Sequence, residues 1–283
     1  MLPGVYSARK KNGEEYYRAS VTYRGKHISL GSYANEKDAS GAYKLAGEVL
    51  ADHSSWTIEG YPASAALTFH KWVVIINFRD NHIYFKNPIY LRKKYFLYYI
   101  NQEQCLKFDA DDLFYYAHHK ILKRGGHLFV SEYGMQVNIL SRYGIKNYAV
   151  AGRDYLFSNG DNRDFSYHNI EIVNQYHGVT RVIRKGKPVY IAKIHINGDF
   201  VIGCYESETE AAIAYNKAAL LLKNNGCLKN FAQNFIEGID EIAYASAFQK
   251  LRISKKLLSY ARNMKNDMIK EISLRFEDTD TGY

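Results

Sequence analysis

The chain has 283 residues, of which 47% are hydrophobic and 24% charged, a composition typical of globular proteins with two or three small domains. Its most apolar window, residues 72–78, is far shorter than the ~20 residues that a membrane-spanning helix needs, which argues against a membrane partner. The net charge of +9 favours an anionic partner. The three cysteines lack CxxC spacing, which indicates a reducing, cytoplasmic compartment.

Residues 1–55 predict a small sheet followed by a helix. Three short alternating runs are separated by glycine-containing turns at 11–14 and 24–26, a pattern that predicts a three-stranded antiparallel meander. The helix should begin after Asn35, whose side chain can cap the first turn.

Residues 56–84 should connect this module to the middle of the chain, and the apolar window 72–78 predicts a buried strand within them. The middle segment, residues 85–177, contains an aromatic run that should form a helix ending near His118 and His119. The acids before this helix are expected to cap its start: Asp109, Asp111 and Asp112. With His127, these histidines show no recognised metal spacing, so neither a metal site nor a cofactor is expected.

Residues 178–227 repeat the first module. Gly178 matches Gly4, Gly203 matches Gly31, and the spacing downstream of that glycine is the same in both copies. The matched pairs are Tyr33/Tyr205, Ala39/Ala211, Tyr43/Tyr215 and Ala46/Ala218. We therefore expect a second meander, followed by a helix that Ser207 caps.

Residues 228–283 predict two helices, one over 235–251 and the next capped by Ser254. The second helix carries an apolar stripe formed by Leu257, Ala261, Met264, Met268 and Ile272. Such a stripe can pack on its own domain or join two copies of the chain as a homodimer, and the sequence leaves both alternatives open.

The positive charge lies mainly on the two repeated sheets. Residues 1–33 carry six Lys or Arg against two acids, and residues 178–205 carry five against one. Because successive side chains alternate between the faces of a strand, Arg18, Ser20 and Thr22 should share the face that the helix leaves open. A ribbon of this width fits the major groove of DNA, although a solvated sheet face would show the same pattern.

Both copies resemble the Apetala-two/ethylene-response-factor DNA-binding domain, which also occurs in phage and bacterial endonucleases and integrases. The motifs that carry the resemblance are a Gly-Val pair, Ala192-Lys193-Ile194 or Ala19-Ser20-Val21 in the second strand, a Gly-x-Tyr, and the helix start ExEAAxAYNxAA. The second copy matches closely, whereas the first departs at Gly41, Lys44 and Gly47. Neither copy has the Trp that plant members place on the sheet.

The resemblance implies that the open face contacts major-groove bases and phosphates. Carried over by position, the candidates in the first copy are Tyr6, Lys10, Arg18, Ser20, Thr22, Lys26, His27 and Ser29. Those in the second copy are Arg184, Lys185, Lys187, Lys193 and His195, with Asp199 and Val201 also facing outward. Ile191 and Val201 stand where a base-contacting residue is usually polar, so no base preference follows.

Residues 154–174 resemble the C-terminal half of an HNH endonuclease domain. Asn159, Gly160, Asp164, Asn169, Ile170 and Val173 fall on that pattern. HNH chemistry needs a histidine to activate water and a neighbouring carboxylate to bind metal, and these positions hold Phe157 and Leu156. We therefore expect no catalytic residue here, and we expect Asp164 and Asn169 to fix the turn and to cap a following helix.

The sequence thus predicts an α+β protein, with a degenerate HNH-like domain between two sheet-and-helix modules and a helical C-terminal region. The expected function is sequence-preferring binding of double-stranded DNA by a nucleoid-associated, cytoplasmic transcriptional regulator or a phage or mobile-element protein. Two alternatives stay open: a divergent HNH nicking endonuclease, and a protein-interaction module or inhibitor that kept the fold.

Overall fold

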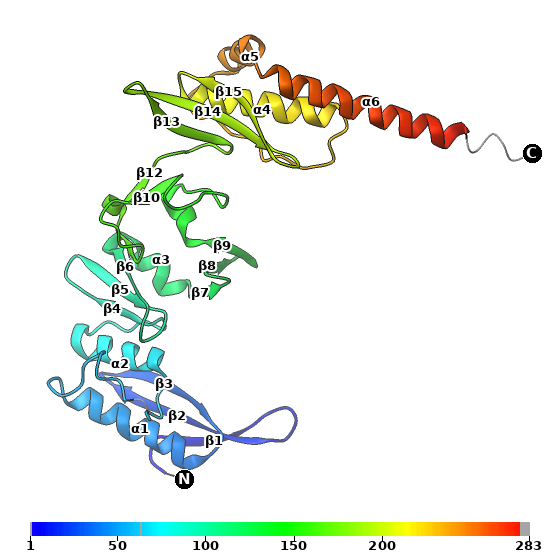
Figure 1. Ribbon diagram of the computed structural model, residues 1–283. Helices are drawn as coiled ribbons and strands as arrows, with labels where there is room; N and C mark the ends of the chain where they lie inside the picture. The colour runs from blue at the N-terminus through cyan, green and yellow to red at the C-terminus, as the bar shows by residue number, and fades with distance from the viewer. Residues whose placement is uncertain (1, 63, 278–283) are drawn as a thin grey trace, which may run out of the picture. The chain divides into compact units, whose positions relative to one another are not determined.

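The computed structural model describes residues 2–62 and 64–277, with side chains described up to residue 266. The chain has the expected α+β content and divides into two compact units, Met1–Tyr143 with Phe157–Ile170, and Gly144–Leu156 with Glu171–Tyr283 (Figure 1). Each sheet-and-helix module lies in a different unit, so each unit is described by itself.

The first module is an antiparallel meander with a helix across one face. Its strands are β1 (Val5–Arg9), β2 (Glu15–Tyr23) and β3 (Lys26–Tyr33), followed by α1 (Glu36–Ala51). Ala19, Ile28 and Leu30 face the helix and are buried with Ala39, Ala42 and Val49 of α1. The Asn35 side chain accepts a hydrogen bond from the Asp38 N–H at 2.8 Å, which confirms the predicted cap.

Residues 72–78 form a helix, so the predicted buried strand is wrong. They belong to α2 (Phe69–Asn81), in which every residue from Trp72 to Arg79 is buried. An apolar run that is buried on all sides shows neither helical nor strand periodicity, so its sequence does not distinguish a helix from a strand. The structural signals lie outside the run: Thr68 caps the helix start, and His82 ends it in the left-handed conformation.

The rest of the first unit holds two small sheets around an aromatic core. Phe96, Phe108 and Tyr116 are fully buried, with the Phe108 and Tyr116 ring centres 4.4 Å apart. The four-stranded sheet has the order β11-β6-β5-β4 and the other is β7-β8-β9. The elements are β4 (Ile89–Leu91), β5 (Tyr95–Tyr99), β6 (Cys105–Asp109), η1 (Ala110–Asp112), α3 (Leu113–His118), β7 (Ile121–Arg124), β8 (His127–Glu132), β9 (Met135–Asn138), η2 (Ile139–Tyr143) and β11 (Asp164–Phe165).

The module in the second unit repeats the backbone of the first. Its elements are β13 (Val179–Arg184), β14 (Lys187–His195), β15 (Asp199–Tyr205) and α4 (Glu208–Asn224). The register shifts after Ala192 as it does after Ala19, and the following N–H in each strand donates to a glycine carbonyl, Gly178 or Gly4. Ser207 and Glu210 form a reciprocal capping box at the helix start.

Two further helices, α5 (Glu241–Lys250) and α6 (Lys255–Glu277), end the described chain. The first begins six residues later than predicted, because Asp240 accepts a hydrogen bond from the Ala243 N–H and caps it there. Ser254 caps α6 as expected, with its hydroxyl accepting from the Leu257 N–H at 3.3 Å. Leu257 and Ala261 are buried in the core of their own unit, whereas the side chains of Met268 and Ile272 lie outside the described residues.

Candidate nucleic-acid interface

The open face of the first module is polar and exposed. The register pairs Tyr6 with Arg18 and Thr22 with His27 across the face opposite α1. Of the candidates on this face, Tyr6, Lys10, Arg18, Thr22, His27 and Ser29 are exposed and Ser20 is half-buried. The alternation in the sequence thus placed these side chains correctly.

Arg18 lies at the centre of this face without a counter-ion. Its cross-strand neighbours are Tyr6 on β1 and Ser32 on β3, and no carboxylate in the described chain pairs with it. Lys10, at the end of the β1–β2 hairpin, does have a counter-ion, because its ammonium lies 2.9 Å from the Glu14 carboxylate. The guanidinium of Arg18 is therefore available for an external anion.

Lys26 does not lie on the open face, contrary to the prediction. The two-residue turn at Arg24 and Gly25 pairs Lys26 with Tyr23, whose side chain faces the core. The Lys26 ammonium lies 5.1 Å from the centre of the Tyr84 ring, on the α2 side of the sheet. Lys26 and His27 are neighbours on one strand and therefore point to opposite faces, and His27 is the one on the open face.

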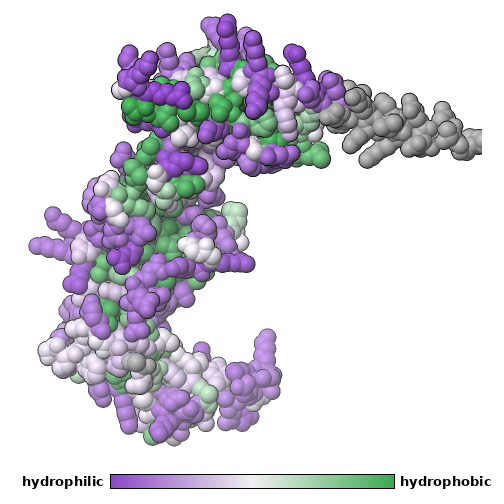
Figure 2. Space-filling view, viewed as in Figure 1, coloured by the Kyte–Doolittle hydropathy of each residue, from purple (hydrophilic) through white to green (hydrophobic). Residues whose placement is uncertain are grey.

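The open face of the second module is more apolar. Its register pairs Lys193 with Val201, which is 48% exposed, and Ile191 with Cys204. The exposed basic candidates gather toward the hairpin end of β13 and β14, namely Arg184, Lys185 and Lys187. Figure 2 shows hydrophobic surface around β13 and mainly hydrophilic surface around the β1–β2 hairpin.

Some polar side chains on this second face already have partners. His195 Nδ1 lies 2.8 Å from Asp199 Oδ1 across the strands. The Arg184 guanidinium approaches the Cys204 sulfur at 3.8 Å. Lys193, Lys185 and Lys187 have no acidic partner within the described residues, so they remain the cations that an external phosphate can reach.

The HNH-like segment places hydrophobic side chains at the catalytic positions of that pattern. Phe157, in β10 (Tyr155–Phe157), packs edge-on against Phe165 with ring centres 5.7 Å apart, and the adjacent Leu156 is exposed. Neither side chain can take a proton or bind a metal ion. Asp154, the nearest carboxylate upstream, is buried and accepts from the Val150 N–H and from Arg153.

Asp164 fixes the turn as predicted, but the helix expected after Asn169 is absent. Burial raises the pKa of the Asp164 carboxyl, yet hydrogen bonds from Ser166 and Lys107 outweigh it and hold the pKa below its ordinary value. Asn169 ends η3 (Tyr167–Asn169), and its amide donates to the Asp164 carbonyl at 2.8 Å. The chain then enters β12 (Ile170–Ile172), so the capping role was wrong because this amide is used within the turn.

The acids before α3 have tertiary partners rather than capping roles. Neither Asp109 nor Asp112 accepts a hydrogen bond from the helix start. Asp109 accepts from the Tyr167 N–H at 2.8 Å, and the buried Asp112 forms an ion pair with Arg142. These partners are distant in sequence, which is why local pattern suggested caps instead.

The histidines of the central segment bond to their own helix. His118 Nδ1 lies 2.8 Å from the Phe114 carbonyl, and His119 Nδ1 lies 3.0 Å from that of Tyr115. Throughout the described chain, no three His, Cys, Asp or Glu side chains come within reach of a common metal ion.

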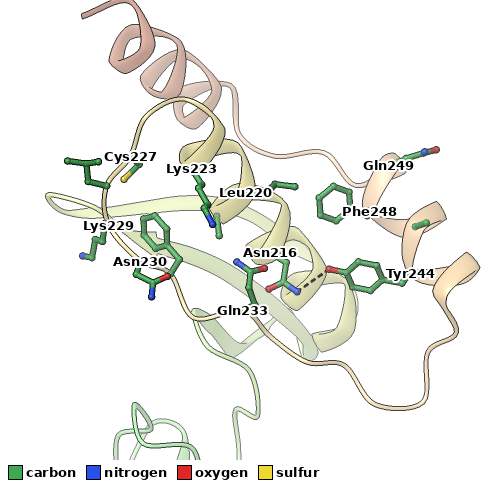
Figure 3. Close-up of a pocket in the computed structure, with 14 residues that line it drawn as sticks. Asn216, Leu220, Lys223, Cys227, Lys229, Asn230, Gln233, Tyr244, Phe248 and Gln249 are labelled. Atoms are coloured by element: carbon green, nitrogen blue, oxygen red, sulfur yellow. Dashed lines mark hydrogen bonds between the residues drawn. The ribbon is translucent and has the colours of Figure 1, made fainter. Parts of the chain in front are cut away.

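The second unit also contains a groove that the sequence did not reveal. Its volume is about 790 Å³, and it lies between α4, α5 and the segment that joins them (Figure 3). Leu220 and Phe248 provide apolar walls, Lys223 contributes a cation, and the Asn216 amide donates to the Tyr244 hydroxyl at 3.1 Å. Residues 225–234 show no regular periodicity, and the helix predicted from residue 235 begins only at Glu241, so the sequence did not place this segment beside α4.

No family model, no curated protein and no solved structure matches this chain. The two family resemblances therefore rest on sequence motifs alone, and a functional argument must rest on the geometry of the faces described above. Every helix in the described part of the chain is too short or too polar to cross a lipid bilayer.

Proposed function

We propose that this chain is a sequence-preferring double-stranded DNA-binding protein, and that the open face of β1–β3 makes the principal contact. The observation that carries the proposal is Arg18, an exposed guanidinium without a counter-ion in the described residues, at the centre of a polar sheet face. The face is uncovered because α1 packs on the opposite side.

The side chains around Arg18 suit contact with a duplex. A three-stranded sheet presents a ridge of closely spaced strands, and the major groove of B-DNA, about 12 Å wide, admits a ribbon of strands. Arginine can bond two acceptors of guanine at once, and hydroxyl groups such as that of Thr22 can bond either bases or phosphates. Tyr6 and His27, both exposed beside these groups, extend the polar face along the neighbouring strands.

The second module supports this contact mainly through phosphates. Its unpaired Lys185, Lys187 and Lys193 are exposed, while Val201 and Ile191 occupy positions where a base-reading face would carry donors. Two binding modules on one chain raise each other's effective concentration, so weak contacts of the second module add to the first. We further propose that the chain acts in transcriptional regulation or in the DNA transactions of a phage or mobile element in a cytoplasmic nucleoid, a role that the sequence resemblance of its two modules suggests.

Selection from a random duplex library at near-physiological salt, with Mg²⁺ present, tests the proposal. We expect enrichment of intact DNA that shares one or two short motifs. Enriched DNA that carries nicks would instead assign the chain to the divergent HNH endonucleases, and binding that disappears at moderate salt without enrichment would favour a protein partner.

A matched pair of variants sharpens the same experiment. Arg18→Ala should strongly reduce enrichment of the motif. Lys37→Ala removes a positive charge from the exposed surface of α1, on the far side of the sheet, and should leave the enrichment unchanged. Equal loss in both variants would mean that only net charge matters, and the open face would no longer carry the function.

A further inference from the structure

A groove in the first unit gathers cations and aromatic rings. Its volume is about 580 Å³, and it lies between the β2–β3 turn, the segment after α2 and the helix α3. The lining residues are Lys26, Tyr84, Phe85, Lys86, Asn87, Leu113, Phe114, Ala117 and His118. None of these side chains is acidic, and the groove contains none of the open-face residues assigned above to duplex contact.

The walls of this groove are held together by buried contacts. The Asn87 amide donates to the Tyr116 carbonyl at 2.7 Å, which ties the segment after α2 to α3. Tyr84 packs edge-on against Phe78, which packs edge-on against Tyr23 of β2. The three segments therefore form a preorganised surface, and binding need not order them.

Phe114 is an aromatic ring presented to solvent on this surface. It is 80% exposed, and its ring centre lies 4.7 Å from that of His118 one helical turn later. Burying a phenylalanine side chain normally stabilises a fold by about 1.5–3 kcal/mol, so this ring contributes little to the unit that carries it. Its open face is available for stacking with a planar ligand.

The charge around Phe114 is positive and unneutralised. Lys86 is exposed and Lys26 lies over the Tyr84 ring, and neither has an acidic partner within the described chain. Burial lowers the pKa of the nearby Lys71, and the like charge of Lys86 lowers it further. A ligand for this groove should therefore combine negative charge with an aromatic plane.

We propose that the groove binds an unpaired nucleotide of single-stranded nucleic acid, with the base stacked on Phe114 and the phosphates beside Lys26 and Lys86. Proteins that hold single strands combine an aromatic platform with a basic groove in this way. A base within a duplex cannot offer its face to the ring, whereas an acidic peptide would satisfy the lysines and leave Phe114 without a stacking partner.

Fluorescence anisotropy with a labelled dT20 oligonucleotide and the full chain tests the proposal. Phe114→Ala should weaken dT20 binding roughly tenfold, and Phe114→Trp should retain it, because stacking on an aromatic side chain contributes strongly for each base. The matched control is Tyr133→Ala, which removes a 95% exposed ring from the β8–β9 turn of the same unit and should leave binding unchanged. Equal affinities of Phe114→Ala and the wild type would overturn the proposal.

Four further measurements separate the source of the ligand from the role of charge. An abasic oligonucleotide should bind the wild type as weakly as dT20 binds Phe114→Ala, and Lys86→Ala should make the salt dependence shallower by about 0.7 in log–log slope. Displacement of dT20 by equimolar thymidine monophosphate would assign the groove to free nucleotides instead. Displacement by polyglutamate at equal charge would overturn the nucleotide assignment.

The groove proposal and the duplex proposal can be tested independently of each other. Phe114→Ala should not change affinity for duplex DNA, and Arg18→Ala should not change affinity for dT20, because the two side chains lie on different faces of the first unit. If Arg18→Ala reduces both affinities equally, a single binding surface explains all the data and the separate groove site is wrong.

Discussion

The two sheet-and-helix modules share a backbone and differ on the face that their helices leave uncovered. Ala19 and Ala192 are both buried under a helix, and both precede the same register shift. On the opposite face the second strand carries Arg18, Ser20 and Thr22 in one module and Ile191, Lys193 and His195 in the other. Aligned on the buried alanines, Ile191 occupies the position of Arg18, and the cation Lys193 occupies the position of Ser20, two residues further along the strand.

This difference shows which constraint acts on each face. A helix packed closely on a sheet permits only small or complementary side chains, so the covered positions match between the modules. The open positions contact solvent or a partner, so they can differ without cost to the fold. We infer that the two modules contact different features of a bound duplex, and four predictions test this comparison.

The largest expected effect concerns the glycines that begin each module. Gly178 and Gly4 have φ values of 73° and 71°, a conformation that strains alanine. An alanine Cβ would clash with a tyrosine ring at both positions, 2.0 Å from Tyr43 at residue 4 and 2.4 Å from Tyr215 at residue 178. At residue 178 it would also lie 2.5 Å from the Lys193 carbonyl oxygen, which belongs to the backbone and can shift less. We expect Gly178→Ala to lower the free energy of unfolding by about 3 kcal/mol and Gly4→Ala by about 2 kcal/mol.

Urea denaturation can assign these losses to the two units. The two tryptophans of the chain, Trp56 and Trp72, both lie in the first unit, so their fluorescence reports its unfolding while circular dichroism reports both. Gly4→Ala should shift the fluorescence midpoint, and Gly178→Ala should shift only the dichroism. A fluorescence shift for Gly178→Ala would mean that the units unfold together.

The next largest effect is on duplex affinity, when one cation is removed from each open face in turn. Arg18→Ala should weaken binding to the selected duplex about tenfold, or about 1.4 kcal/mol, and Lys193→Ala about threefold. Because Lys193 is assigned to a phosphate, its loss should also reduce the salt slope by about one unit while lowering affinity equally for all sequences. If Lys193→Ala changed the preferred sequence instead, the second module would contact bases, and its assignment to phosphates would be wrong.

A smaller effect should follow from the acid on the second face. Asp199 pairs with His195 and places negative charge beside Lys193. We expect Asp199→Asn to strengthen duplex binding about twofold to threefold, because removing an exposed acid from a phosphate-facing surface reduces repulsion. Asp161→Asn, in an exposed turn of the first unit, serves as the matched control and should leave affinity unchanged.

The last prediction concerns pH and applies to the second module alone. Burial holds the pKa of His177 below its ordinary value, with the nearby Arg153 lowering it further. The folded state therefore favours the neutral ring, so the stabilisation is complete above about pH 6.5 and is lost as the pH falls through the lower folded pKa. The position equivalent to His177 in the first module is Pro3, which cannot titrate.

Hydrogen exchange between pH 7.5 and 5 can detect this difference. Protection in β13–β15 should fall as the pH is lowered while protection in β1–β3 changes less. His177→Phe should flatten the response of the second module, since the ring still packs between Tyr148 and Tyr215 but no longer binds a proton. An unchanged pH response in this variant would show that other groups control the acid stability.

The sequence by itself determined the elements whose signals are local. Alternation and glycine turns located both meanders, and Asn35, Ser207 and Ser254 marked the starts of three helices because a cap is formed by residues only two or three positions apart. The repeat established that the second module would copy the first. The open-face positions depend only on the alternation of side chains along a strand, which is also local, and they were assigned correctly except at Lys26.

The tertiary structure decided everything that depends on partners distant in the chain. The run at 72–78 lies in a helix that is buried on all sides, which no local periodicity indicated. Asp112 pairs with Arg142, thirty residues away, instead of capping α3. Both grooves join segments with no common sequence pattern, and only folding sets Lys26 and Lys86 beside the exposed Phe114 ring. Local pattern records the geometry of neighbouring residues, whereas these contacts depend on packing across the whole unit.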